Sequence, residues 1–148
     1  MLIKLKELLK KHEGYRNRPY DDYDGKTIGI DGKNTIIGKL TIGVGRNIQD
    51  KGLSNDEIEY LLDNDIKSAK NDAKTATKNF DKLSSNRQDV FISMIFNLGL
   101  TRFLKFTKML KAIEKEDWKQ VKKEMLDSLW AKQVKERANE LANLIEKG

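Results

Sequence analysis

Glycines and β-branched residues crowd into one short stretch near the N-terminus. Short β-branched runs occur at residues 27–30, 35–37 and 40–42, separated by turn residues that include Asp-Gly pairs. This is the pattern of strands joined by tight turns. The glycines of the stretch lie at positions 14, 25, 29, 32, 38, 43 and 45. We therefore expect a small antiparallel sheet that is confined to the N-terminal third of the chain.

Apolar residues recur at helical spacing on both sides of this stretch. Residues 2–9 carry a leucine stripe with Lys and Glu on the opposite face, and the stripe ends near His12. Residues 90–98 are apolar nearly all round and are followed by Gly99, a natural helix stop. That segment predicts a buried central helix in the C-terminal part of the chain.

Two helix starts can be read between these segments. Ser54 and Glu57 form a capping box, in which each residue satisfies a free backbone N–H of the first turn. A helix over about 55–78 is expected to follow. Ser85 and Gln88 stand in the same relation before the central helix. The fold class is therefore expected to be α+β and mostly helical.

Composition excludes several kinds of chemistry. The 148 residues suit one domain that is long enough to bury a core. There is no cysteine, which excludes disulfides, thiolate metal sites and a cysteine nucleophile. The single histidine, His12, gives no support to a His-based metal site or a Ser-His-Asp arrangement. We expect no metal and no cofactor.

The chain is basic, with a net charge of +6. This charge fits an anionic partner such as nucleic acid, a membrane surface or a bacterial wall, and it fits solvated lysines on helix faces equally well. The lysines are dispersed and most aromatic residues fall on apolar stripes, which disfavours nucleic acid. No apolar run approaches the roughly 20 residues that span a bilayer. Lysines interrupt the N-terminal apolar residues, so no signal peptide is expected.

Several carboxylates precede the glycine-rich turns. Glu13 falls at the end of the first helix, where the helix dipole disfavours a negative charge. Cover by the C-terminal part of the chain would keep it protonated as a general acid. Asp21, Asp22 and Asp24 follow, and acidic residues before Asp-Gly usually just make turns. A second, ionised carboxylate is nonetheless what a glycosidase needs opposite its acid. Thr41, by itself, is an ordinary strand residue.

Taken in order, these residues resemble the phage-type lysozymes, the endolysins of glycoside hydrolase family 24. The resemblance rests on Glu13-Gly14, on Tyr20-x-Asp22 and on the run Thr-Ile-Gly-Val-Gly-Arg-Asn at 41–47. It continues more loosely through the C-terminal part and covers nearly the whole chain. The further matching positions are the capping box at Ser54, residues 96–99, residues 106–110, Trp118 and residues 128–138.

The resemblance implies a role for each of three site residues. Glu13 matches the general acid of the family, and Asp22 matches its second carboxylate. Thr41 matches the threonine that, together with the Asp, holds the attacking water. Hydrolysis with inversion is implied, which predicts carboxyl groups separated by roughly 6.5–9.5 Å.

Contacts with the glycan are implied at further positions. The wall-binding residues of the family fall on Asn47, in the loop after the sheet, and on Phe96, in the central helix. Two other contact positions fall on Met109 and Glu124. Those two side chains match the family poorly, and no role is assigned to them.

One departure from the family leaves the second carboxylate open. The family usually has only a few residues between the Asp and the Thr, whereas residues 23–40 intervene here. The surplus is either an enlarged hairpin after Asp22, or a sign that Asp24 with Thr27, or Asp31, has taken the role. We prefer Asp22 with Thr41, because Thr27 lacks the Gly-Arg-Asn sequel. Glu13 is unaffected.

The resemblance also implies an architecture, with a single lysozyme domain over residues 1–148. A small β lobe would cover about 13–56, a connecting helix about 55–78 and a helical lobe about 80–148. The first helix would pack on the C-terminal lobe, and the active cleft would lie between the lobes. We expect a monomer.

The activity implied is that of a muramidase that lyses the host cell. It would hydrolyse the β-1,4 bond between N-acetylmuramic acid and N-acetylglucosamine in peptidoglycan. Synthesis in the host cytoplasm is expected, without stable membrane insertion, and action on the wall after the membrane is permeabilised. The alternatives are a catalytically altered peptidoglycan-binding protein or a lytic transglycosylase of the same fold, and, more distantly, a small basic nucleic-acid-binding protein.

Overall fold

The computed structural model describes residues 2–148. The chain divides into two compact units, Met1–Ile58 and Glu59–Gly148, and the boundary falls inside one long helix. We call them the β unit and the helical unit. None of the described helices is long and apolar enough to cross a membrane. The predicted α+β, mostly helical fold class is confirmed.

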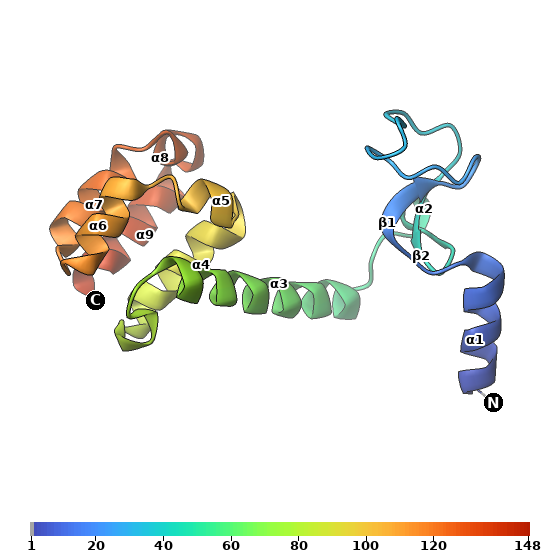
Figure 1. The fold of residues 1–148 in the computed structure, drawn as a ribbon, viewed down its shortest axis with the longest axis horizontal. Helices are drawn as coiled ribbons and strands as arrows, with labels where there is room; N and C mark the ends of the chain where they lie inside the picture. Colours follow the sequence, from blue (N-terminus) through green and yellow to red (C-terminus); the bar gives the residue numbers. More distant parts are fainter. Residues whose placement is uncertain (1) are drawn as a thin grey trace. The chain divides into compact units, whose positions relative to one another are not determined.

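The β unit contains one helix, a three-stranded antiparallel sheet and a further short helix (Figure 1). Its strands are arranged in the order β1-β2-β3, so that each strand pairs with the next along the chain. Thr41, in the central strand, pairs with Tyr20 on one side and with Asn47 on the other. The elements are α1 (Leu2–Glu13), β1 (Arg16–Asp21), β2 (Leu40–Gly43), β3 (Arg46–Asn47) and α2 (Ile48–Lys51).

Of the three predicted strands, only the one at 40–42 forms as expected. Residues 27–30 contribute isolated bridges and turns, and residues 35–37 are irregular, so both of these predictions were wrong. The physical reason is that side-chain carboxylates accept hydrogen bonds from the backbone N–H groups that would otherwise pair with a neighbouring strand. Asp31 accepts the Thr27 N–H at 2.7 Å, and Asp21 accepts the Ile37 N–H at 2.6 Å. The partners of β2 are instead β1 and β3.

The helical unit holds the apolar core. The long helix α3 enters it from the unit boundary, and α4 lies at its centre, with four buried apolar side chains on successive turns. The elements are α3 (Asn55–Ala76), the 3-10 turn η1 (Phe80–Lys82), α4 (Ser85–Leu98), α5 (Leu100–Phe103), α6 (Thr107–Glu114), α7 (Trp118–Leu126), α8 (Leu129–Val134) and α9 (Glu136–Lys147). The predicted buried central helix at 90–98 is therefore confirmed.

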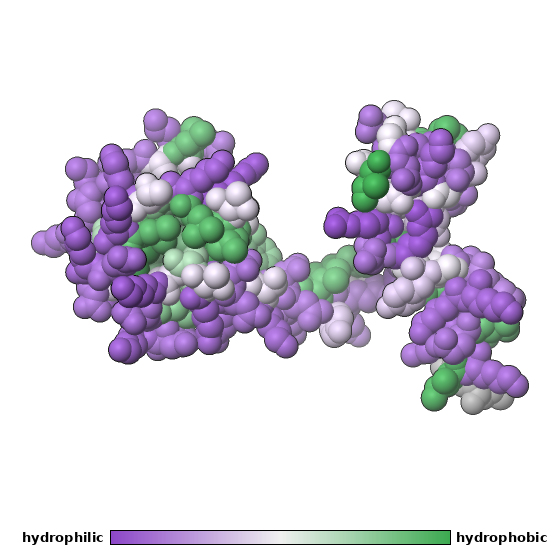
Figure 2. Space-filling view, viewed as in Figure 1, coloured by the Kyte–Doolittle hydropathy of each residue, from purple (hydrophilic) through white to green (hydrophobic). Residues whose placement is uncertain are grey.

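Aromatic and sulfur-containing side chains fill this core. Phe91 and Phe103 meet edge to face with ring centroids 6.2 Å apart, and Phe103 stacks on Phe106 at 6.5 Å. Such pairs add about 0.5–1.5 kcal/mol to what burial of their area contributes. Met94, Met109 and Met125 are fully buried around them. Figure 2 shows hydrophilic side chains over most of the surface and an apolar area on the presented face of the helical unit.

The helices begin and end largely where the sequence predicts. The Ser54 N–H donates to the Glu57 carboxylate at 2.8 Å, and the Glu57 N–H donates to the Ser54 hydroxyl at 3.3 Å, which is the predicted capping box. Gly99 ends α4 with a φ of +78°. The second predicted start is displaced by one residue, because Ser84 rather than Ser85 caps α4.

Candidate active site

Glu13 is the last residue of α1, as its position after the leucine stripe predicts. Its side chain is exposed within the β unit and lies against the backbone of Gly45. A Cβ atom on Gly45 would lie 2.8 Å from the Glu13 Oε2 and 3.2 Å from its Cβ. The glycine therefore provides the space in which the Glu13 carboxylate lies beside the turn between β2 and β3.

Asp22 and Thr41 meet at the backbone of Lys39. The Lys39 N–H donates to the Asp22 Oδ1 at 2.6 Å, and the Asp22 N–H donates to the Lys39 carbonyl at 3.1 Å. The Thr41 hydroxyl donates to the same carbonyl at 3.0 Å. The long segment between Asp22 and Thr41 thus returns to its starting point, and both residues contact a single peptide.

This arrangement leaves two acceptors with defined directions. The hydrogen of the Thr41 hydroxyl is used by the Lys39 carbonyl, so that its oxygen is free only to accept. An ionised Asp22 also only accepts. A pair of acceptors can take both hydrogens of one water molecule and leave its lone pairs directed outward, which suits attack on a carbon atom.

The other acidic residues of the stretch are engaged locally. Asp24 binds the Lys33 ammonium at 2.9 Å and accepts the Lys26 N–H at 3.0 Å. Asp31 accepts the Thr27 N–H, which closes a turn. The hydrogen bonds of Asp24 and Asp31 go to Lys26, Lys33 and Thr27, whereas Asp22 binds Lys39 directly.

Asp21 is the most buried carboxylate of the β unit and is not exposed at all. Burial by itself would raise its pKa. Hydrogen bonds from the N–H groups of Ile37 and Tyr23, from the Lys33 ammonium and from the Gly38 N–H outweigh this effect and hold the pKa of Asp21 well below its usual range. These hydrogen bonds therefore favour the ionised form of Asp21 in the folded protein.

Asp21 and Lys33 were not recognised from the sequence as partners. They lie twelve positions apart, and neither periodicity nor a motif connects them. Their Oδ2 and Nζ atoms lie 3.1 Å apart, and the Lys33 side chain is almost as buried as Asp21. The sequence offers one signal that Asp21 has a separate role: two consecutive aspartates stand at the end of a strand, where a single aspartate is enough to make a turn.

The two predicted glycan contacts belong to different units. Asn47 caps α2: its Oδ1 accepts the Asp50 N–H at 3.0 Å and its Nδ2 donates to the Asp50 carboxylate at 3.0 Å. Phe96 lies on α4 in the helical unit and is 46% exposed. Its ring borders a shallow hollow between α3 and α4 whose other walls include Asp65 and Asp72. Both assignments remain predictions.

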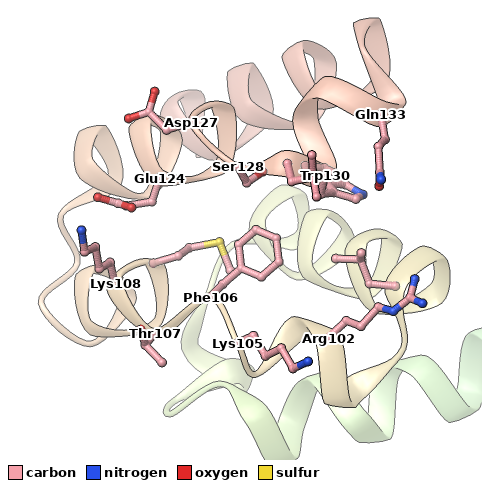
Figure 3. Close-up of a pocket in the computed structure, with 13 residues that line it drawn as sticks. Arg102, Lys105, Phe106, Thr107, Lys108, Glu124, Asp127, Ser128, Trp130 and Gln133 are labelled. Atoms are coloured by element: carbon pink, nitrogen blue, oxygen red, sulfur yellow. The ribbon is translucent and has the colours of Figure 1, made fainter.

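A larger pocket of about 680 Å³ lies within the helical unit. Figure 3 shows Phe106 and Trp130 facing its interior, with Arg102 and Lys105 on one rim and Glu124 on the opposite side. Met109 also lines it, so the two family contact positions to which no role was assigned border the same pocket. Its apolar floor and charged rims suit an amphipathic ligand such as a sugar carrying acidic or amino substituents.

No group of three or more His, Asp or Glu side chains within residues 2–148 is placed to hold a metal ion. The predicted acid–base residues Glu13, Asp22 and Thr41 all lie in the β unit. Glu13 is positioned by a helix end, and Asp22 and Thr41 are positioned by a strand and its preceding peptide. The 680 Å³ pocket lies separately, within the helical unit.

An α+β chain with these features belongs to the lysozyme-like proteins. The phage lysozyme family model matches residues 10–147, and the chain is a member of that family. It is 30% identical to "Probable T4-type lysozyme 2" of Dictyostelium discoideum, in an alignment that covers all of this chain and 96% of that protein. It is 29% identical to "Pre-baseplate central spike protein Gp5" of Enterobacteria phage T4, of which it covers 28%. The family supports a muramidase-type function that hydrolyses peptidoglycan.

Proposed function

We propose that this protein is an endolysin that hydrolyses the β-1,4 bond between N-acetylmuramic acid and N-acetylglucosamine and so lyses the host cell. The observation that supports this most directly is the convergence of Asp22 and Thr41 on the Lys39 peptide. These two contacts with Lys39 form despite the long intervening segment, and they support the role that the family resemblance implies for Asp22 with Thr41.

In the proposed mechanism Glu13 protonates the oxygen that leaves the anomeric carbon. Asp22 and the Thr41 oxygen accept the two hydrogens of one water, and its lone pair attacks that carbon from the opposite face. Asp22 takes the proton that the water loses. The new hydroxyl then has the α configuration, because attack opposite to the leaving group inverts the anomeric centre.

The helical unit contributes the proposed glycan-binding surface. The 680 Å³ pocket offers the half-buried ring of Phe106 to the apolar face of a sugar, and its charged rims can bind polar substituents. Phe96 and Asn47 are proposed as further contacts. The positive charge of +6 would attract the protein to an anionic wall. We further propose that the protein is made in the host cytoplasm and reaches the wall once the membrane is permeabilised.

The proposal is tested by digestion of purified peptidoglycan and identification of the products by mass spectrometry and NMR. The wild type should release reducing muropeptides with α-anomeric ends. Glu13→Gln and Asp22→Asn should each lower kcat by about 10²–10⁴-fold, the contribution of one proton-transfer group. Thr41→Ala should lower it by about 10-fold, since one hydrogen bond to the water is lost.

Other outcomes would identify the alternatives. Full activity of Glu13→Gln would refute the lysozyme mechanism, and 1,6-anhydro ends would show a transglycosylase. Wall binding without any product would show a peptidoglycan-binding protein that has lost catalysis. Asp81→Asn is the control, because it removes an exposed carboxylate that pairs with Lys74 and has no proposed role, so it should retain kcat within about twofold.

A further inference from the structure

The segment between β1 and β2 begins and ends at neighbouring positions of the sheet, where Asp21 pairs with Leu40. The sheet fixes these two ends, but the residues between them need contacts of their own to hold one conformation, because each ordered residue loses conformational entropy. Its first residue is Asp22, and its last is Lys39, whose N–H binds the Asp22 carboxylate. How this segment is fixed therefore decides where the Asp22 carboxylate lies.

A single buried carboxylate fixes the segment at three places. The Asp21 Oδ1 accepts the N–H of Tyr23 at 3.0 Å, near the start, and the N–H of Gly38 at 2.9 Å, near the end. The Asp21 Oδ2 accepts the N–H of Ile37 at 2.6 Å and lies 3.1 Å from the Lys33 Nζ. Every one of these donors belongs to the intervening segment.

The peptide around Gly38 passes directly against both aspartates. A Cβ atom at this position would lie 2.2 Å from the Asp22 Oδ1, 2.8 Å from the Asp21 Oδ1 and 2.9 Å from the Tyr23 Cβ. The φ angle of Gly38 is not in the left-handed region, so the position requires the absence of a side chain and not an unusual backbone conformation. The three consecutive N–H groups of 37–39 point at Asp21, Asp21 and Asp22.

We propose that Asp21 is a positioning residue for the hydrolysis: by binding the amides of Ile37 and Gly38, it holds the Lys39 amide against Asp22 and so orients the carboxylate that directs the water. This inference rests on the proposed function. Asp21 itself does not touch the substrate, since its side chain is completely buried.

Lys33 provides the counter-charge that the buried Asp21 carboxylate requires. A buried carboxylate is costly unless a counter-charge and hydrogen bonds compensate for its lost hydration. The Lys33 ammonium supplies that charge and binds Asp24 as well, at 2.9 Å. Because hydrogen bonds and this ammonium keep Asp21 ionised, the amides of 37 and 38 retain an acceptor with two oxygens over the working pH range.

The test is Asp21→Asn, assayed on soluble peptidoglycan fragments. An amide presents one acceptor oxygen and one NH₂ group, so that a donor now faces either a backbone N–H or the Lys33 ammonium. We expect kcat to fall about 10- to 100-fold, the scale of a misplacement of about 1 Å in a reacting group, while KM changes less than about twofold. Asp81→Asn is the control, because it removes the exposed partner of Lys74 and should change neither constant.

A double variant separates positioning from general damage to the fold. If Asp21 acts through Asp22, then Asp21→Asn should have little effect in an Asp22→Asn background, assayed at raised enzyme concentration. A loss of equal size in both backgrounds would overturn the inference, as would wild-type kcat for the single Asp21→Asn variant. Full activity of Glu13→Gln would instead refute the proposed function itself.

Gly38→Ala provides the test if Asp21→Asn does not fold. It keeps every hydrogen-bonding group and moves the peptide of residue 38 away from both carboxylates. The expected result is again a fall in kcat with an unchanged KM. Wild-type kcat in folded Gly38→Ala would overturn the inference, because hydrolysis would then not depend on the close contact between the Lys39 amide and the Asp22 carboxylate.

Discussion

At the scale of single residues, Glu13 depends on the bare backbone of Gly45. The glycine has a φ of +62°, which disfavours any other residue, and its missing side chain makes room for the Glu13 carboxylate. Two different physical demands therefore meet at one position, one on backbone conformation and one on space. They can be separated, because Gly52 has nearly the same φ, +63°, with no atom within 4 Å of its Cβ position.

We therefore predict different outcomes for two alanine variants. Both variants should lose stability: Gly45→Ala by about 1–2 kcal/mol, the cost of a positive φ for a residue with a side chain, and Gly52→Ala by at least that much, because its ψ of −152° lies in a region that is essentially restricted to glycine. Only Gly45→Ala should also lose kcat, by about 10- to 100-fold, since its Cβ displaces the Glu13 carboxylate. Urea unfolding and muropeptide release measure the two effects. Equal kcat losses in both variants would show that Gly45 has no specific relation to Glu13.

Asp21 makes the stability of the β unit dependent on pH. Its pKa in the folded protein lies far below the value of about 3.9 in an unfolded chain. The stabilisation is therefore fully present above about pH 4 and is lost as the pH falls toward the folded pKa. We expect the NMR amide signals of β2 to report less folded protein in fixed urea as the pH falls from about 5 to about 2. Asp21→Asn should flatten this dependence, and an unchanged slope would contradict the assignment.

At the scale of elements, the helices α4, α7 and α8 of the helical unit each begin at a side chain that accepts a hydrogen bond from an N–H of the first turn. Asp117 caps α7 by accepting the Gln120 N–H at 3.1 Å. Ser128 connects α7 with α8, since its hydroxyl donates to the Met125 carbonyl at 2.6 Å and accepts the Ala131 N–H at 3.1 Å. At these three helices a few residues near the N-terminal end are therefore sufficient to set where the helix begins.

Removal of one such cap should have a defined cost. Asp117→Ala is expected to destabilise the helical unit by about 1 kcal/mol, because one N–H of the first turn of α7 loses its acceptor. Asp63→Ala, an exposed aspartate in the interior of α3, should cause no loss, since alanine is the better helix former there. Urea denaturation followed by circular dichroism measures both variants. A loss in Asp63→Ala as large as in Asp117→Ala would argue against the cap.

Local signals explain which parts of the structure could be predicted. The helix starting at Ser54 and the stop at Gly99 follow from residues within four positions of each other, and both form as expected. The strands expected at 27–30 and 35–37 did not form, because Asp31 accepts the Thr27 N–H in a local turn and a distant carboxylate accepts the Ile37 N–H. No pattern of neighbouring residues shows that Asp21 will take the N–H of Ile37, sixteen positions away.

The candidate site likewise has features that local sequence predicts and features that depend on non-local contacts. Glu13 could be assigned because a helix end and a family motif coincide there. Asp22 and Thr41 could be named from the resemblance, but their meeting at Lys39 could not be predicted through the long intervening segment. Non-local contacts of this kind carry no periodicity in the sequence.

At the scale of the whole molecule, the apolar core belongs to one unit only. The contiguous cluster of buried apolar residues runs from Ala69 to Ile145, whereas Tyr20 is the buried apolar side chain of the β unit among the described residues. The β unit depends instead on its hydrogen bonds and on the Asp21–Lys33 pair. The opening reactions that let the amide hydrogens of the β unit exchange with solvent should therefore cost less free energy than those of α4.

A core substitution should confirm where the apolar stabilisation lies. Phe103→Ala is expected to destabilise the helical unit by about 3–5 kcal/mol, because it removes a fully buried ring that packs on Phe91. Leu104→Ala, one residue further and 44% exposed, should cost much less. Urea denaturation measures both. Similar losses for the two variants would contradict the assignment of Phe103 to the core.

The position of the tryptophans adds an optical consequence. Trp118 and Trp130 both belong to the helical unit, whereas the aromatic side chains of the β unit are tyrosines. Trp130 is 3% exposed, donates its indole N–H to Asn97 at 2.9 Å and borders the 680 Å³ pocket, and the Arg87 guanidinium lies 3.9 Å above the ring of Trp118. Emission excited at the red edge, where tyrosine does not absorb, therefore provides a label-free signal of pocket occupancy. The same emission does not change when the turns around Asp22 unfold, because no tryptophan lies in the β unit. The midpoint temperature of thermal unfolding followed by tryptophan fluorescence therefore need not equal the midpoint temperature of the loss of lytic activity.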